Sequence, residues 1–411
     1  MRQSIVLSAA LVPGLLAPLA GAEPAATERV FVTATRTTLA EDEILAPIVV
    51  ITREELERAT AADVADLLRF RAGIEIARTG GPGQTTTLFM RGTESNHTLV
   101  LVDGVRINPG TIGVAALQNI SPELIERIEI VKGPRSTIYG SDAIGGVVNV
   151  ITRSGARDGV VVSLGAGQYG TRDASLTAGA SGEAGDLTLG TSWLDSSGFP
   201  TRTGDETDRG YRNLSFNVAG RSQVGSVELS ARAWHAEGTS EYSDFFLTPV
   251  DQDFTNSAAS LSAAFAPAAG WRSKLTASLM RDETRQNQAN FMGQKDFLRT
   301  RRWSADWQND VAVGEHHAIT AGALLQRETA DTLSYGSGFD VGTDVNLYYV
   351  QDRITAGRHR GLLAVGLTDH ETFGSQVTWN AEYGFELRPG TSIYTVAGTA
   401  FRAPDATDRY G

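Results

Sequence analysis

The chain has 411 residues, a formal net charge of −12, 41% hydrophobic residues and no cysteine. Without cysteine there is no disulfide, thiolate nucleophile or cysteine metal site. The acidic balance argues against nucleic acid as a partner, because phosphate binding requires a basic surface. No stretch approaches the ~20 consecutive apolar residues of a transmembrane helix, but a transmembrane β-strand needs an apolar side chain only at every second residue.

Residues 1–22 are predicted to be a secretory signal peptide. Arg2 supplies a basic start, Ile5–Leu19 is apolar, and Ala20-Gly21-Ala22 offers small residues for cleavage before Glu23. The apolar run is too short, and too interrupted by proline and glycine, to span a membrane as a helix. A buried N-terminal helix is the alternative. Export excludes a cytoplasmic enzyme.

Residues 23–45 form a small, polar segment that contains one extended stretch. This stretch consists of Glu28, Arg29, Val30, Phe31, Val32, Thr33, Ala34 and Thr35. In it, Arg29, Phe31, Thr33 and Thr35 alternate with Val30, Val32 and Ala34. Alternation at this spacing predicts an edge strand. An extended segment near a terminus can add itself to the sheet of a partner through backbone hydrogen bonds.

Residues 46–153 are predicted to form one compact α/β unit, which is long enough to bury its own core. Thr52 and Glu55 form a capping box for a helix over Arg53–Ala59. A second amphipathic helix is predicted over Asp63–Phe70. Strands are predicted over Ile48–Ile51, Ile74–Ala77, Leu88–Arg91 and Leu99–Val102, with a glycine-rich loop at Arg78–Thr86.

The end of this unit is the most informative stretch of the chain. Two β-rich runs, Ile128–Val131 and Val147–Thr152, flank a segment that contains Gly133-Pro134, Gly140 and Gly145-Gly146. Glycine allows backbone conformations and close approaches that a Cβ forbids, and proline fixes φ. The pattern indicates a tightly folded connection; an ordinary hairpin loop, which would need one glycine, is the alternative.

From Gly159 onward, segments of alternating small or polar and apolar residues recur, about thirteen in all and each near the ~10-residue span of a membrane strand. They are Val160–Ala166, Ala174–Ala180, Leu187–Trp193, Leu214–Gly220, Val227–Trp234, Ala259–Phe265, Lys274–Leu279, Trp303–Val311, Ala318–Leu324, Val345–Gln351, Leu362–Leu367, Thr378–Phe385 and Ile393–Ala400. Short turns alternate with long polar ones. A secreted β-sandwich is the alternative, but it does not explain the unit in front.

The glycine-rich stretch resembles the end of the plug domain in TonB-dependent outer-membrane transporters. The matching positions are Glu129, Val131, Gly133, Pro134, Tyr139, Gly140, Gly145, Gly146, Val147, Asn149 and Val150, and Gly398–Gly411 resembles a mid-barrel signature of the family. The resemblance implies an antiparallel membrane β-barrel of about 22 strands with an N-terminal α/β plug in its lumen. Residues 154–411 would then be a partial barrel, and the chain a C-terminally truncated fragment of a longer protein.

The resemblance also implies location, partners and energy source. The protein would lie in the bacterial outer membrane as a monomer, in contact with lipid. Residues 23–45 would face the periplasm, and Glu28–Thr35 would be the TonB box, which pairs with TonB. TonB would draw energy from the inner-membrane proton gradient through the ExbB/ExbD complex. A signalling receptor with an extra N-terminal domain and a passive porin are rival interpretations.

Within the family, the plug resembles the cobalamin (vitamin B12) branch most. Shared runs include LVDGVRIN at Leu101–Asn108 and GSDAIGGVVN at Gly140–Asn149. The resemblance implies ligand contacts at Thr85, Thr87, Glu94, Ile112 and Gly113. The family usually has an amide where Glu94 stands and a serine where Gly113 stands, so a ferric-siderophore or other metallophore receptor is the alternative. The same turns could also be plain surface loops.

The cobalamin branch also binds calcium through acidic outer loops, and here the corresponding acids are Asp205, Asp208, Asp244, Asp251 and Asp253. Calcium requires six to eight oxygen ligands, several of them carboxylates. Pro200 and Arg209 stand where the family has acids, so a solvated acidic loop is the favoured interpretation. No other cofactor is expected. His316-His317 are adjacent and no HExxH, Walker or GxSxG motif occurs, so no enzymatic activity is predicted.

Overall fold

The computed structural model describes residues 31–33, 36–37, 39–40, 43–59, 61, 63–69, 71, 73–155, 158–244, 246–290, 292–388 and 391–411. The predicted signal peptide and five residues of the predicted TonB box, Glu28, Arg29, Val30, Ala34 and Thr35, therefore lie outside the described residues. Of Phe31 and Val32 only the backbone is described. In the part of the chain that is described, no helix is long and apolar enough to cross a membrane.

The plug is built on a five-stranded mixed sheet in the order β3-β8-β9-β6-β7. Its strands are β3 (Ile48–Ile51), β6 (Thr98–Val102), β7 (Val105–Arg106), β8 (Ile125–Lys132) and β9 (Gly146–Thr152). Only β6 and β9 run parallel. A separate hairpin joins β4 (Ile74–Arg78) and β5 (Thr86–Met90). Fully buried aliphatic side chains from these strands, Ile51, Ile74, Ile128 and Ile130 among them, form the core.

Short helices complete the plug: α1 (Arg53–Arg58), α2 (Val64–Leu68), α3 (Ser136–Tyr139), η2 (Ser95–His97), η3 (Leu117–Asn119) and η4 (Pro122–Leu124). The predicted capping box is confirmed at α1, and Asp63 caps α2 through the backbone N–H of Asp66. The sequence did not predict α3, a single turn inside the glycine-rich stretch. It ends at Gly140, whose φ of +77° is the left-handed conformation that glycine adopts without strain.

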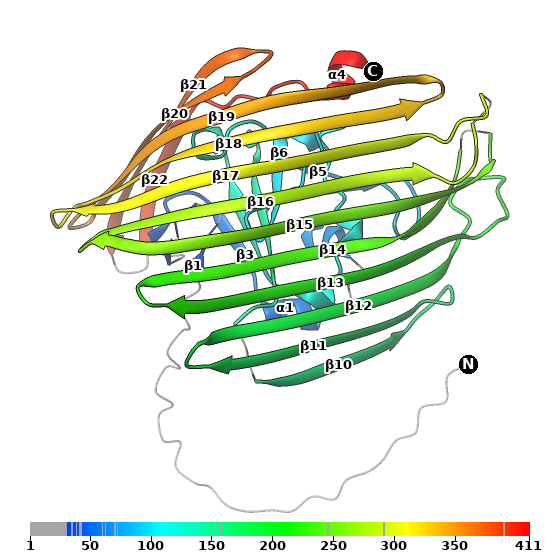
Figure 1. The fold of residues 1–411 in the computed structure, drawn as a ribbon, viewed down its shortest axis with the longest axis horizontal. Coiled ribbons are helices and arrows are strands. Elements are labelled where there is room, and N and C mark those ends of the chain that lie inside the picture. Colours follow the sequence, from blue (N-terminus) through cyan, green and yellow to red (C-terminus); the bar gives the residue numbers. More distant parts are fainter. Residues whose placement is uncertain are drawn as a thin grey trace, which may run out of the picture.

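The larger part of the chain is one antiparallel sheet of thirteen strands, each paired with the next along the chain (Figure 1). The strands are β10 (Gly159–Ala166), β11 (Arg172–Gly182), β12 (Gly185–Phe199), β13 (Arg209–Val224), β14 (Val227–Ser243), β15 (Pro249–Ala268), β16 (Trp271–Gln286), β17 (Phe297–Val313), β18 (His317–Ser334), β19 (Ser337–Ala356), β20 (His359–His370), β21 (Gly374–Arg388) and β22 (Thr391–Gly398). Each predicted segment falls in a different one of them. A short helix, α4 (Ala406–Tyr410), follows β22.

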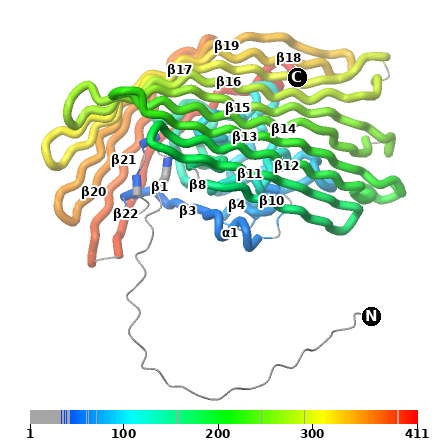
Figure 2. The backbone as a smooth tube through the Cα atoms, turned by 60° about the horizontal axis from the view of Figure 1, so that its bottom comes forward, coloured from blue at the N-terminus to red at the C-terminus, as the bar shows by residue number. Residues whose placement is uncertain are grey.

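The sheet curves around the plug and forms a partial barrel wall (Figure 2). On β21, for example, Val377 and Trp379 face outward, whereas Thr378, Asn380 and Glu382 are buried on the inner side. An apolar outer face suits lipid, and a polar inner face suits a lumen that holds a folded domain. The predicted fold class, a partial barrel with an α/β plug, is confirmed. Among the described strands, β10 and β22 are each paired on one side only.

Candidate functional site

The glycine-rich turn of the plug, residues 79–85, packs against the barrel wall. Gly83 has a φ of +72°, and a Cβ at this position would lie 1.8 Å from Cδ2 of Tyr211 on β13. The Tyr211 hydroxyl donates to the Gln118 carbonyl over 3.0 Å, so the ring is fixed from its other end. Gln84 donates to the Glu241 carbonyl over 3.2 Å. The turn is therefore seated on the wall.

Gly83→Ala should destabilise the seating of the plug by more than the conformational cost of a left-handed alanine, about 1 kcal/mol. The added methyl overlaps the Tyr211 ring, and Tyr211→Ala should relieve part of the loss in a double-mutant cycle. Thermal unfolding measures the effect. Gly92→Ala is the matched control, because Gly92 has a φ of +73° with nothing within 4 Å of its Cβ position. Equal losses at both glycines would contradict the steric argument.

A second plug loop, Pro109–Gly113, lies beside the turn that begins at Glu94. Gly113 has a φ of +69°, and a Cβ there would lie 2.8 Å from Cβ of Asn96 and 3.1 Å from Oδ2 of Asp405. Its carbonyl accepts a 2.9 Å hydrogen bond from the Asn108 side chain. This crowding gives a physical reason for glycine where the family usually has serine.

The five residues predicted to contact ligand occupy three neighbouring tips of the plug. Thr85 is exposed at the start of β5, and the Thr87 hydroxyl donates to the Ala77 carbonyl over 3.2 Å. Glu94 is exposed, with Oε2 3.9 Å from Nε2 of His97. Ile112 is half-buried and Gly113 is buried. Asn96, in the Glu94 turn, lies close to Gly113, and a 3.1 Å hydrogen bond from the Leu88 N–H to the Ser95 hydroxyl joins β5 to the same turn.

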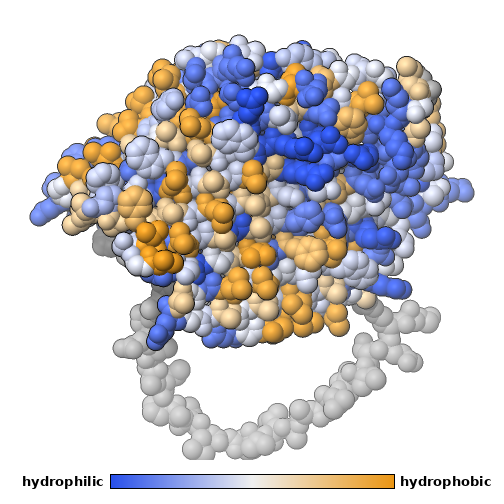
Figure 3. Space-filling view, in the orientation of Figure 1, coloured by the Kyte–Doolittle hydropathy of each residue, from blue (hydrophilic) through white to orange (hydrophobic). Residues whose placement is uncertain are grey.

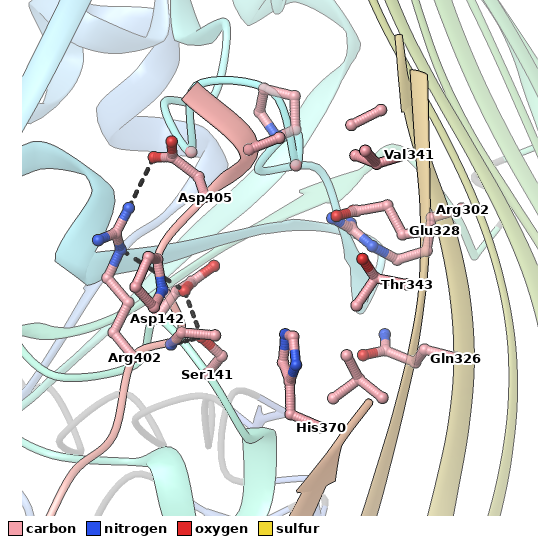
Figure 4. A pocket seen from close by; sticks show the side chains of 18 of the residues that line it. Ser141, Asp142, Arg302, Gln326, Glu328, Val341, Thr343, His370, Arg402 and Asp405 are labelled. Carbon is pink, nitrogen blue, oxygen red and sulfur yellow. Dashed lines mark hydrogen bonds and ion pairs between the residues drawn. The ribbon is translucent and has the colours of Figure 1, made fainter. Parts of the chain in front are cut away.

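Only Gly113 of these five lines the polar pocket between the plug and the wall (Figure 4). This pocket has a volume of about 60 Å³. Arg106 and Ser141-Asp142 come from the plug, Arg302 and Glu328 from the wall, and Arg402 and Asp405 from the segment after β22. Three parts of the chain that are far apart in sequence therefore meet at one point.

Ion pairs and backbone hydrogen bonds hold these three parts together. Arg106 pairs with Asp142, and Arg302 pairs with Glu328 while donating to the carbonyls of residues 106 and 108. Arg402 donates to Asp405 over 2.6 Å and to Asp408 over 3.0 Å. The N–H groups of residues 406 and 407 donate to the carbonyls of residues 110 and 111, over 2.9 Å each. Burial raises the pKa of Asp405 above its ordinary value.

Sequence reasoning did not select these pocket residues. Arg106, Asp142 and Arg402 lie inside the sequence runs that carry the resemblance to the family. These runs could therefore have pointed to the three residues as candidates for the site. Arg302, Glu328 and His370 lie in wall strands. The alternation of apolar and polar residues in these strands predicts which face of the wall a side chain occupies, but not whether it has a function.

Three of the five outer-loop acids, Asp205, Asp244 and Asp253, accept hydrogen bonds from donors of their own chain. Asp205 accepts from Ser243, from the Thr207 N–H over 3.0 Å and from Arg209 over 2.8 Å, and these contacts lower its pKa to about 2. Asp244 accepts from the N–H groups of residues 246 and 248, and Asp253 from Thr239. Within the described residues, no group of three or more acids and histidines is arranged to hold a metal ion. These contacts do not form the oxygen cage that calcium prefers, and calcium binding stays a prediction.

At the opposite end of the plug, the segment that precedes it is bound to the plug sheet. β1 (Phe31–Val32) pairs with β2 (Leu39–Ala40), so the predicted extended conformation is found at these two residues. The N–H of Thr33 donates to the Glu129 carboxylate over 2.8 Å, and Asn149 donates to the Thr33 hydroxyl over 3.2 Å. Glu129 is fully buried on β8 and also pairs with Arg127 at 2.8 Å.

Arg36 connects this segment to the wall. Its guanidinium pairs with Asp306 on β17 and lies 4.9 Å from the ring centroids of both Tyr139 and Tyr349. Burial works to lower the pKa of Arg36, but the Asp306 carboxylate together with Tyr349 and Tyr139 outweighs burial, and the pKa is raised. A charged side chain is thus held between the plug and the wall, with its charge compensated.

Comparison with known proteins agrees with this architecture. Residues 40–147 match the TonB-dependent Receptor Plug Domain family, and residues 159–411 match the TonB dependent receptor-like β-barrel family. The predicted domain boundary at residues 153 and 154 lies between the two matches. The chain is 31% identical over 98% of its length to the vitamin B12 transporter BtuB of Photobacterium profundum, and 31% identical over its whole length to that of Vibrio vulnificus.

Solved structures with the same fold include receptors for other ligands. The siderophore receptor PirA from Acinetobacter baumannii has a TM-score of 0.71 at 18% identity, over 87% of this chain and 61% of PirA. A variant of the ferric enterobactin receptor PfeA from Pseudomonas aeruginosa has a TM-score of 0.75 at 14% identity, over 92% of this chain and 64% of PfeA. The chain spans 67% and 68% of the two curated relatives.

Proposed function

The chain belongs to the TonB-dependent receptor family of the bacterial outer membrane, and on that premise we propose that the protein imports cobalamin with energy supplied through TonB. The observation that carries the choice of ligand is the 31% identity to vitamin B12 transporters over 98% of the chain. Members of this family are receptors and transporters, and the proposed role is transport without catalysis.

The outer tips of the plug are the proposed binding surface. Thr85 and Glu94 are exposed, and Thr87 presents a hydroxyl that can exchange its bond to the Ala77 carbonyl for one to a corrin amide. Because the tips are fixed to one another and to the wall, their polar groups are preorganised for a ligand, which reduces the entropy lost on binding. Asn96 couples the Glu94 turn to Asp405 through a 3.3 Å hydrogen bond, so the segment after β22 shares this surface.

The proposed energy coupling acts at the other end of the plug. A strand added from TonB would pair with the Glu28–Thr35 segment, and a pull on this segment is transmitted to β8 through Thr33 and Glu129. Ligand binding at the outer tips would have to bias this segment through a difference in ligand affinity between two states of the plug. The contacts of Thr33 and Arg36 are those that distinguish the bound state of the segment from a released one.

Transport also requires the plug to move. A cavity of about 420 Å³ lies between the plug and the wall, from Thr33 and Arg36 at one end to Arg106 and Gln326 at the other. Arg106 and Gln326 also line the pocket of Figure 4, so the two spaces adjoin. Sites for drug-sized ligands have volumes of about 300–1,000 Å³. Cobalamin is larger than such ligands, and it could pass only after the cavity widens.

Binding to outer membranes that carry the full-length gene product tests the ligand. We expect saturable cobalamin binding that ferric siderophores do not displace, measured with and without calcium. Glu94→Gln should change the cobalamin dissociation constant by about tenfold, equivalent to about 1.4 kcal/mol, whereas Glu75→Gln, at another exposed plug position, should not. Calcium dependence would assign a metal to the outer loops. Absence of cobalamin binding would show that cobalamin is not the ligand.

A metallophore is the second candidate, because the solved structures of the same fold include siderophore receptors and the copper transporter OprC. The acid at Glu94 presents a negative charge where the cobalamin branch usually has an amide. Displacement of a labelled ferric siderophore by unlabelled siderophore, but not by cobalamin, would favour this alternative.

A further inference from the structure

Inward-facing side chains of the wall form rows across strands β14–β18, because each strand pairs with the next in register. One of these rows lies against the plug and is called the sealing row. It consists of Trp234, Ala258, Met280, Arg302 and Glu328. Its first four members are no more than 5% exposed. The wall and the plug are therefore in close contact along this row.

The plug meets the sealing row with its edge strand β7 and the residues that follow it. Among the described strands, β7 pairs only with β6. Arg302, beside Glu328 in Figure 4, donates to the carbonyls of residues 106 and 108 over 3.0 and 2.7 Å. Ile107, Trp234 and Met280 line a gap of about 10 Å³, which is at the lower limit for one water molecule. A ligand cannot pass between β7 and this row until they separate.

One register step closer to the short turns, the space between plug and wall widens. The next two rows over the same five strands line the cavity of about 420 Å³, which extends to Asp186 and Glu228 beside the short turns. Six of the ten members of these rows carry short hydroxyl side chains: Ser230, Ser260, Ser262, Thr276, Ser278 and Ser304. Small side chains leave open the space that tryptophan, methionine and arginine fill in the sealing row.

The cavity lies at the depth of the lipid-facing band. Leu279 and Trp303 face outward in the register row between the sealing row and the cavity, and the outward row on the other side of the sealing row is Arg281 with Arg301. Figure 3 shows the same change on the outer surface, where hydrophilic residues gather toward the long loops at the right. The sealing row therefore stands at the outer edge of this band, and the cavity crosses it.

A buried amide connects the Glu28–Thr35 segment to the turn that leads into β7. Asn149 is 2% exposed, donates to the Thr33 hydroxyl over 3.2 Å and accepts from the Gly104 N–H over 3.2 Å. Gly104 lies in the turn between β6 and β7, where Asp103 pairs with Arg232 of the wall at 2.8 Å. Displacement of Thr33 removes one hydrogen bond from the amide that holds the β7 turn. A contiguous network of this kind can carry coupling between two sites.

On the basis of the proposed import function, we propose that the ligand passes between β7 and strands β14–β18, and that the sealing row is the gate of this path. An edge strand of two residues can leave the wall with the loss of few backbone hydrogen bonds. Elsewhere the plug stays docked, for example where Ser121 bonds to Ser192 on β12 over 2.7 Å. Hydroxyl groups both donate and accept hydrogen bonds, so the cavity suits a ligand that carries amides, as a corrin does.

Two disulfide tethers test which side of the plug opens, and no other cysteine is present to compete. On the gate side, the Thr111 hydroxyl in the loop after β7 lies 3.4 Å from that of Thr300 on β17, so Thr111→Cys is combined with Thr300→Cys. Ser121→Cys combined with Ser192→Cys is the matched control on the docked side. In cells that carry the full-length gene product, oxidation of the first pair should lower uptake of labelled cobalamin at least about tenfold, and oxidation of the second should change it less than about twofold.

Surface binding of cobalamin should be the same for both pairs, oxidised or reduced. Loss of uptake with both tethers would show that the whole plug must leave, and uptake with both would place the path elsewhere. Either result would overturn the proposal. If the untethered parent imports no cobalamin, the proposed function fails, and the gate is judged by ion conductance, which requires neither ligand nor TonB.

Conductance of the purified full-length protein in planar bilayers measures the seal directly. Met280→Ala combined with Arg302→Ala should raise it at least about fivefold, because the narrowest point of the path then opens into the cavity. Thr276→Ala combined with Ser278→Ala, within the cavity rows, is the control and should leave it unchanged. Heat-dependent electrophoretic mobility shows whether each variant is folded. Equal conductance of the parent and the folded Met280 and Arg302 double variant would exclude a gate at this row.

Discussion

Deletion of residues 28–35 should lower uptake of ligand more than tenfold, to the level of cells that lack the protein, while binding at the outer face stays within about twofold. The reason is that ligand binding and energy coupling take place at opposite ends of the plug. The outer tips of the plug lie at the end of the domain opposite Thr33, which contacts Glu129 and Asn149. Removing the segment leaves the ligand surface in place but removes the site where an added strand could pull.

A pair of point variants makes this experiment more specific. Val32→Pro removes a backbone N–H and so blocks the addition of a strand at this residue, whereas Val32→Ala keeps it. Val32 lies in β1, which pairs with β2 only over two residues. We expect uptake to be lost with proline and kept with alanine. Uptake that survives the deletion, with binding intact, would exclude energy coupling through this segment.

The second large effect concerns Arg36. Arg36→Ala should expose the segment in the absence of ligand. Removal of one partner of a buried ion pair costs about 3–5 kcal/mol, and the substitution also removes the contacts with Tyr139 and Tyr349. The chain contains no cysteine, so a single cysteine placed at position 31 gives a clean signal. Its labelling rate by a thiol reagent should rise at least about tenfold, equivalent to about 1.4 kcal/mol.

Two comparisons limit the interpretation of this result. Asp306→Asn should raise the labelling rate in the same direction, because it removes the charge that compensates Arg36. Arg71→Ala should have little effect, because the pair between Arg71 and Glu55 is exposed, with 39% of each side chain accessible, and exposed pairs contribute about 0–1 kcal/mol. Labelling of the Arg36 variant at the parental rate would show that the segment is held by Thr33 alone.

The wall was the part of the fold that the sequence predicted best. Alternation between an apolar outer face and a polar inner face is a local property, so thirteen segments map one to one onto β10–β22. Their lengths were underestimated. β15 and β19 have 20 residues each, because strands continue beyond the lipid band, where charged residues such as Arg281 and Arg327 replace the apolar members of the pattern.

The contacts that connect distant parts of the chain were not predictable in this way. Arg36 and Asp306 are separated by 270 positions, and neither stands in a motif. The pocket of Figure 4 combines Arg106, Arg302 and Arg402 from three separate regions. The tips of the plug were found through resemblance, which predicts positions but not bonds. The close approach of Gly83 to Tyr211 depends on the seating of the plug, which the sequence alone does not define.

The order of strands in the two sheets also determines the length of the loop that must close before two strands can pair. In the wall, Ala166 pairs with Arg172, six residues away. In the plug, Ile48 pairs with Val131, 83 residues away. Because loop-closure entropy grows as (3/2)RT ln n, the β3–β8 pairing of the plug sheet costs about 2–3 kcal/mol more than the pairing of this wall hairpin. The wall can therefore grow hairpin by hairpin, whereas the plug sheet gains its edge strand β3 only by closing a long loop, in a step of higher contact order.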